Sequence, residues 1–208
     1  MKFYVVKKGF IPGIYRSWDQ CLEVVKGYAG AIYKSFTDLD SAIKYYNDEQ
    51  VDTTLPANKL YIFSDGSFKN GVQPKHTFAV LIPQLDYSYT EVLEVSTNNR
   101  NELLAILHGL EFVFNNISQL NDIESIVIVS DSEYSLNCIS KYSKNWFDSD
   151  MNVIDDTKKN IDIFRLIHIV KNKIKKNIEY VKVKSHSNNL DVLSYYNDKV
   201  DKLAQNAC

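Results

Sequence analysis

Two aspartates in this chain directly follow apolar runs that are typical of β-strands. Residues 60–64 precede Asp65, and residues 126–130 precede Asp131. If the two strands lie side by side and point the same way, both carboxylates reach one place. Their negative charges would repel each other there unless a cation lay between them, and oxygen ligands of this kind suit Mg²⁺. The pair therefore indicates a site for a divalent cation.

Each aspartate taken singly also fits an ordinary structural role. Ser64-Asp65-Gly66-Ser67 is a good turn sequence. Asp131-Ser132 is a good beginning for a helix. The metal interpretation therefore depends on further residues that could share the site.

Four other side chains could take part in such chemistry. Glu102 stands three residues after Asn99, which also fits the returning partner of a capping box. Asp198 and Asp201 share one helical stretch, and their spacing alone does not choose between them. His186 follows a strand in a polar loop, which suits either a surface residue or a mobile proton carrier.

The elements that must position these residues form a mixed sheet with helices. Strands are expected from Leu60 and over 78–82, 91–95, 126–129 and 178–183, and helices around 103–114, 132–142, 164–171 and 200–207. Three antiparallel strands come first, and strands that alternate with helices follow. This order predicts an α/β fold with a mixed five-stranded sheet and helices on its faces.

The front of the chain predicts a separate small α/β module. Strand-like residues 3–6, 14–15 and 31–36 alternate with two helices, one capped by Ser17 and one opened by Asp38 or Asp40. Polar residues and Pro56 then interrupt the periodicity. The predicted organisation is a first domain at 1–47, a linker at 48–58 and a second domain at 59–208.

Composition bounds the class of protein. The 208 residues are 45% apolar and 24% charged, which favours a globular protein. No apolar run approaches the ~20 residues of a membrane span, and Lys2 and Lys7 charge the start too soon for a signal peptide. We expect an intracellular protein without a membrane partner. The three distant cysteines indicate neither a disulfide framework nor a cysteine zinc site.

Charge is distributed unevenly along the chain. Residues 1–47 carry seven Lys/Arg and four Asp/Glu, whereas the rest carries 17 basic and 22 acidic residues. A basic module joined to an acidic body suggests that residues 1–47 bind a polyanion and that the rest of the chain processes it.

The acidic residues and His186 form an ordered series that resembles type I ribonuclease H. The motifs are Asp-Gly-Ser at 65–67, Thr-Asn-Asn-Arg-Asn-Glu at 97–102, Ser-Asp-Ser at 130–132, Lys-Ser-His-Ser at 184–187 and Asn-Asp-Lys-Val-Asp-Lys-Leu-Ala at 197–204. The resemblance covers residues 60–208, and its specificity comes from the order of the five motifs. It implies an endonuclease that hydrolyses the RNA strand of RNA–DNA hybrids to 5′-phosphate products.

The resemblance also implies roles for the acidic residues. Asp65, Glu102, Asp131 and Asp201 would hold two Mg²⁺ ions, with Mn²⁺ as a substitute. One ion would activate water, and the other would stabilise the leaving 3′ oxygen. The Val-Asp-Lys-Leu-Ala match selects Asp201 over Asp198. His186 would assist proton transfer or product release.

Substrate contacts follow from the same motifs. Asn70, Asn98, Asn99 and Asn137 match positions that read the minor groove or the 2′-hydroxyls of RNA. Thr97 and Asn160 match a pocket for a DNA phosphate. In a chain this rich in asparagine, turns and helix caps are the alternative use of the asparagines.

The front module resembles the hybrid-binding domain that often precedes this nuclease. The match implies that Tyr4, Trp18 and Tyr33 pack against DNA sugars and that Lys34 meets phosphate. The alternative for aromatic residues in so small a domain is core packing, which we expect for Phe3 and Phe36 instead. We expect the protein to be a monomer.

One stretch departs from the family pattern. Many members carry a basic protrusion after the third catalytic acid, whereas residues 146–156 here contain four acids and no base. We therefore expect affinity for the hybrid to depend mainly on residues 1–47. Two rival functions remain: a hybrid-binding protein with an inactive nuclease fold, and a polynucleotidyl transferase such as an integrase or transposase.

Overall fold

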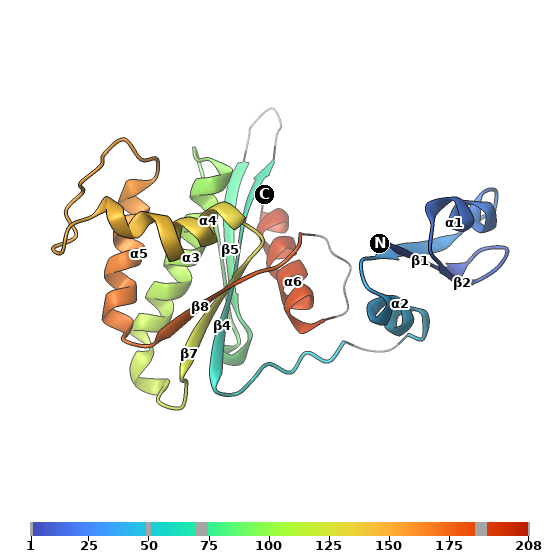
Figure 1. Ribbon diagram of the computed structural model, residues 1–208, viewed down its shortest axis with the longest axis horizontal. Coiled ribbons are helices and arrows are strands. Elements are labelled where there is room, and N and C mark those ends of the chain that lie inside the picture. The colour runs from blue at the N-terminus through green and yellow to red at the C-terminus, as the bar shows by residue number, and fades with distance from the viewer. Residues whose placement is uncertain (1, 49–50, 70–74, 186–190, 208) are drawn as a thin grey trace. The chain divides into compact units, whose positions relative to one another are not determined.

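The structure is a computed structural model that describes residues 2–48, 51–69, 75–185 and 191–207 (Figure 1). The chain divides into two compact units. The first comprises residues 1–54 with 184–195, and the second comprises 55–183 with 196–208. Among the described residues, no helix combines the length and the apolar character needed to cross a lipid bilayer.

The N-terminal unit is built on a small antiparallel sheet with strand order β2-β1-β3. Its elements are β1 (Phe3–Lys8), β2 (Gly13–Tyr15), α1 (Trp18–Val25), β3 (Ile32–Phe36) and α2 (Leu39–Tyr46). Ser17 caps α1 by accepting from the Gln20 N–H, and Asp38 caps α2 by accepting from the Ser41 N–H. The structure thus confirms the predicted cap at Ser17 and selects Asp38 over Asp40.

Each face of this sheet has its own small core. Residues of α1 pack on Val6, whereas Ala42 of α2 packs on Val5 and Phe36. Successive residues of β1 and β3 therefore point alternately to the α1 face and the α2 face. Phe36 is buried as expected, while Phe3 is only half-buried beside it.

The C-terminal unit contains the predicted mixed sheet. Its strand order is β6-β5-β4-β7-β8, formed by β4 (Lys59–Lys69), β5 (Lys75–Ile82), β6 (Tyr87–Leu93), β7 (Ser125–Ser130) and β8 (Asn177–Lys182). β4, β5 and β6 pair antiparallel, while β7 pairs parallel with both β4 and β8. The five-stranded mixed sheet is therefore confirmed.

Helices cover both faces of this sheet (Figure 1). They are α3 (Asn98–Asn115), α4 (Glu133–Asn137), α5 (Ile161–Ile174) and α6 (Val192–Ala207). A single π-helical turn, Cys138–Tyr142, extends α4. α3 and α5 lie on one face and α6 lies on the other, where the Thr77 hydroxyl donates to the Ala204 carbonyl at 2.8 Å. The main core, which includes Ile62, Leu103, Ile128 and Phe164, fills the α3 side.

One strand differs from the sequence prediction. β6 spans Tyr87–Leu93 rather than residues 91–95. A short 3₁₀ helix, Pro83–Leu85, and Asp86 with φ 47° close the connection from β5, so that Tyr87 pairs with Ile82. Tyr89 stacks on His108 of α3 with ring centroids 3.9 Å apart. The strand is thus fixed by packing on α3, which its own periodicity does not reveal.

Candidate active site

Asp65 and Asp131 occupy matching positions on two parallel strands. Phe63 of β4 is paired with Val129 of β7, and each aspartate lies two residues further along the chain. β7 ends at Ser130, so Asp131 follows a strand end as predicted. β4 continues to Lys69 in its pairing with β5, so Asp65 lies inside a strand rather than at a tip or in a turn.

Glu102 reaches the same place from the first turns of α3. Thr97 caps this helix by accepting from the Arg100 N–H, so the capping box centred on Asn99 is not formed. Glu102 is buried, with 3% of its surface exposed. The helix can approach β4 this closely because residue 66 is glycine. A Cβ atom there would lie 2.6 Å from the Glu102 nitrogen.

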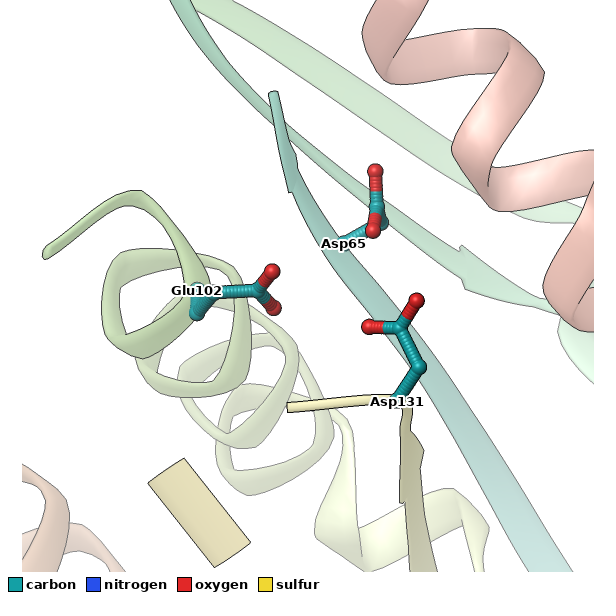
Figure 2. Close-up of side chains that lie close together, drawn as sticks. All are labelled: Asp65, Glu102 and Asp131. Carbon is teal, nitrogen blue, oxygen red and sulfur yellow. The ribbon is translucent and has the colours of Figure 1, made fainter. Parts of the chain in front are cut away.

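The three carboxylates converge on one point, and Figure 2 shows them turned toward one another. Each of Asp65, Glu102 and Asp131 offers an oxygen atom, and these atoms all lie within 4.8 Å of one another. Asp65 and Glu102 are buried, whereas Asp131 is partly exposed. Two carboxylates of the cluster are thus buried, and the third is partly accessible to solvent.

The electrostatics of this cluster favour a bound cation. Burial, assisted by the charges of Asp131 and Asp201, raises the pKa of Asp65 from 3.8 to about 8. Burial and the charges of Asp65 and Asp131 raise the pKa of Glu102 well above its usual 4.5. The nearby backbone N–H of Gly66 lowers both pKa values and opposes these shifts only in part. Because a divalent cation would offset the repulsion, the residues fit a hard cation with oxygen ligands, such as Mg²⁺ or Mn²⁺.

α6 brings a fourth carboxylate to the cluster. Asp201 is half-buried, and its charge contributes to the raised pKa of Asp65. It is not one of the three groups whose oxygens meet within 4.8 Å. Asp201, and not Asp198, is the α6 acid whose charge acts on Asp65. The side-chain amide of Gln205 donates to Asp201 Oδ1 at 2.5 Å.

Arg100 links the two residues expected to bind a DNA phosphate. Its backbone N–H donates to Thr97 Oγ1 at 3.3 Å, and its guanidinium donates to Asn160 Oδ1 at 3.4 Å. The guanidinium also forms a two-pronged ion pair with Asp162, with donor–acceptor distances of 3.1 and 2.6 Å. Sequence reasoning assigned no role to Arg100 or Gln205. The place of Arg100 inside the 97–102 motif could have drawn attention to it, as could the spacing of four residues between Gln205 and Asp201.

The asparagines predicted to contact the RNA strand lie in different parts of the second domain. Asn98 and Asn99 are exposed in the first turn of α3, ahead of Glu102. Asn137 ends α4 and lines a cavity of about 330 Å³ together with Lys141 and Tyr180. Asn70 and His186 lie outside the described residues.

The N-terminal unit carries an aromatic cluster on the α1 face. The Trp18 ring lies 5.7 Å from that of Tyr4 and 5.7 Å from that of Tyr33, measured between centroids. Trp18 and Tyr33 are 40% and 46% exposed, more than core residues would be. Lys34 follows Tyr33 on β3 and therefore points to the opposite face, where its ammonium lies over the rings of Phe36 and Tyr45. The structure thus groups the three aromatic residues and places Lys34 behind them.

The acidic stretch that departs from the family pattern is folded back on itself. Phe147 pairs with Val153 in an isolated bridge. The Asp148 carboxylate accepts from the backbone N–H groups of Asp150 and Asn152. Asp155 pairs with Lys158 at 3.0 Å. Part of the negative charge therefore stabilises the loop itself.

Comparison with known proteins agrees with this architecture. Residues 57–208 match the RNase H family model, and residues 2–46 match the model of the Ribonuclease H1 N-terminal domain. A Ribonuclease H of Crithidia fasciculata is 58% identical over 43 residues, which cover 21% of this chain and 9% of that protein. A Ribonuclease H of Saccharomyces cerevisiae is 50% identical over 40 residues, which cover 19% of this chain and 12% of that protein. In both short matches the chain spans about a tenth of the relative's length.

Two further matches cover most of the chain, one in sequence and one in structure. A Ribonuclease H of Schizosaccharomyces pombe is 23% identical, with 98% of this chain and 96% of that protein covered. The crystal structure of LC9-RNase H1, described as a type 1 RNase H with the type 2 active-site motif, superposes with a TM-score of 0.54 at 17% identity, covering 74% of each chain. At this identity the superposition concerns the fold alone.

Proposed function

Because the chain belongs to the RNase H family, we propose that it is an endonuclease that cuts the RNA strand of RNA–DNA hybrids to 5′-phosphate products. The observation that carries this proposal is the convergence of Asp65, Glu102 and Asp131 at one partly open point. A divalent cation would offset the repulsion between carboxylates that lie this close, and such cations can catalyse the hydrolysis of a phosphodiester.

We assign the cation site to Asp65, Glu102, Asp131 and Asp201, with Mg²⁺ as its occupant. Two such ions, when bound, supply a nucleophilic water and stabilise the leaving 3′ oxygen of the RNA. The protein's part is to hold the carboxylates: β4 and β7 fix the aspartates in register, and α3 brings in Glu102. Ser130 Oγ, 3.5 Å from Glu102, helps to orient that carboxylate.

Proton transfer or product release is assigned to His186. The proposal rests on the Lys-Ser-His-Ser motif at 184–187 alone, since His186 lies outside the described residues. A histidine suits this task because its ordinary pKa is close to neutral pH. Its loss should slow turnover more than it weakens metal binding.

Recognition of the hybrid is assigned to both domains, which we place at 1–47 and 59–208 with a linker at 48–58. The aromatic cluster of Tyr4, Trp18 and Tyr33 would pack on DNA sugars, where a 2′-hydroxyl would clash. Asn98, Asn99, Asn137 and Asn70 would read the RNA strand. Thr97 and Asn160, joined by Arg100, would hold a DNA phosphate, and Lys34 would reach phosphate from the other face of its sheet. We propose that a monomer suffices.

Cleavage of an end-labelled RNA–DNA hybrid with and without Mg²⁺ tests the proposal. The native chain should cut the RNA strand only with the metal, and the products should carry 5′-phosphates. Asp131→Asn should lose the activity, while duplex DNA and duplex RNA should stay intact. An intact hybrid under these conditions would indicate a binding protein instead, and strand transfer on pure DNA would indicate a transferase.

A further inference from the structure

We infer that Gln205 is a positioning residue for Asp201, the acid that α6 contributes to the proposed metal site. This inference rests on the proposed function, because it concerns a ligand of that site.

The contact follows from helix geometry. Residues four apart lie on one face of a helix, one turn from each other. Both residues belong to α6, which runs to Ala207. Gln205 Nε2 donates to Asp201 Oδ1 at 2.5 Å. The amide therefore fixes one carboxylate oxygen of Asp201.

The four acids differ in how they are held. Asp65 and Glu102 are buried, with only 6% and 3% of their surfaces exposed. Asp201 is only half-buried on the last helix, and its side chain has more freedom to lose when it orders. A hydrogen bond to such a ligand limits that freedom, as neighbours of metal ligands commonly do.

The chemistry of an amide suits this task. A lysine or arginine would bring a positive charge that competes with the cation for the carboxylate. A neutral N–H donor orients the carboxylate and leaves its charge available to the metal. Gln205 also lines a polar cavity of about 450 Å³ with Ser67, Lys69 and Asn206. Asn206 lines the same cavity and also carries a side-chain amide, which makes it a matched control for the contact between Gln205 and Asp201.

Two measurements on the full chain test the inference. Titration calorimetry gives the affinity for Mg²⁺, and steady-state cleavage of the hybrid gives kcat and KM. Gln205→Ala should weaken Mg²⁺ affinity by about tenfold and lower kcat, while the KM for the hybrid stays unchanged. Gln205→Met, which keeps the length and removes the donor, should behave in the same way. Gln205→Arg, which keeps an N–H donor but adds a positive charge, should stay below the native Mg²⁺ affinity. Asn206→Ala should match the native chain in every measurement.

Native Mg²⁺ affinity in Gln205→Ala and Gln205→Met would overturn the inference. An equal loss in Asn206→Ala would also overturn it, because the effect would then belong to the cavity and not to the contact. The titration separates this inference from the proposed function. A native chain that binds Mg²⁺ but leaves hybrids intact contradicts the nuclease proposal, whereas the variants still decide the role of Gln205.

Discussion

Gly66 and Glu102 are in closer contact than any other residue type at position 66 would permit. A Cβ atom on residue 66 would lie 2.6 Å from the Glu102 nitrogen and 2.8 Å from the Asn101 Cβ. The first turns of α3 therefore rest directly on the backbone of β4. This contact brings the Glu102 carboxylate to the same place as Asp65.

We expect Gly66→Ala to move the beginning of α3 away from β4. The added methyl group would clash with backbone atoms of α3 that can move only if the helix shifts. The free energy of unfolding should therefore fall by about 1–3 kcal/mol. Cleavage activity should fall as well, because Glu102 would leave the cluster. Chemical unfolding and steady-state cleavage give both quantities.

Gly13→Ala is the matched control for that change. The nearest atom to its added Cβ would be 3.5 Å away, in the Tyr15 side chain. This variant should unfold and cleave like the native chain. Equal behaviour of Gly66→Ala and Gly13→Ala would contradict the proposed packing of α3 on β4.

Without metal, the stability of the C-terminal domain should fall as the pH rises. The folded pKa of Asp65 is about 8 against 3.8 for the free side chain, and that of Glu102 is raised as well. The folded state therefore binds more protons than the unfolded state between these values. The contribution is complete below about pH 4 and is lost as the pH rises through about 8.

Urea unfolding in EDTA at pH 5.5 and pH 8.5 measures this effect. Asp65→Asn should be more stable than the native chain at the higher pH, by about 2 kcal/mol, because it removes the buried charge. Added Mg²⁺ should restore the native chain and leave Asp65→Asn largely unaffected. Asp150→Asn, which changes an exposed carboxylate, should show neither effect. A native stability that rises steadily with pH in EDTA would argue against the cluster.

Trp18→Ala should weaken hybrid binding. Trp18 lies between Tyr4 and Tyr33 and exposes 40% of its surface, so its loss opens the middle of the aromatic cluster. Loss of one such stacking contact should raise KM by about tenfold and leave kcat unchanged. Tyr28→Ala provides the control, since the Tyr28 ring contacts Phe10 instead. Equal KM values for the two variants would remove Trp18 from the proposed interface.

Deletion of residues 1–47 should raise KM more than any single change in the module. The acidic residues at 148–156 leave the second domain without a basic loop at that position, so affinity should come mainly from the front of the chain. The rate of the chemical step should change little, which single-turnover cleavage at saturating enzyme can show. Unchanged affinity for the hybrid after the deletion would contradict this division of roles.

The sequence was sufficient to predict the mixed sheet and the approach of Asp65 to Asp131, because both follow from local patterns and strand order. Apolar runs predicted β4 and β7, and their parallel pairing brought Asp65 and Asp131 together as expected. Capping chemistry predicted the beginning of α1 at Ser17. These features follow from neighbouring residues and from the rules of chain connection.

What the sequence missed depends on contacts between distant elements. The sequence placed Asp65 at a strand tip, with a turn as the alternative because Asp-Gly-Ser favours turns, but pairing with β5 keeps it within a strand. Glu102 read equally well as a capping partner, since only the approach of α3 to Gly66 shows that it is buried. The resemblance gave Lys34 a phosphate contact without a face of the sheet, and only the strand pairing shows that Lys34 lies on the side opposite Tyr33.

Asp65, Glu102, Asp131 and Asp201 are proposed to bind divalent cations together. Anomalous diffraction from crystals of the full chain soaked in Mn²⁺ tests this proposal most directly. Metal peaks are expected in direct contact with Asp65, Glu102 and Asp131, with Asp201 completing the site. Manganese bound elsewhere, with these carboxylates free of metal, would contradict it.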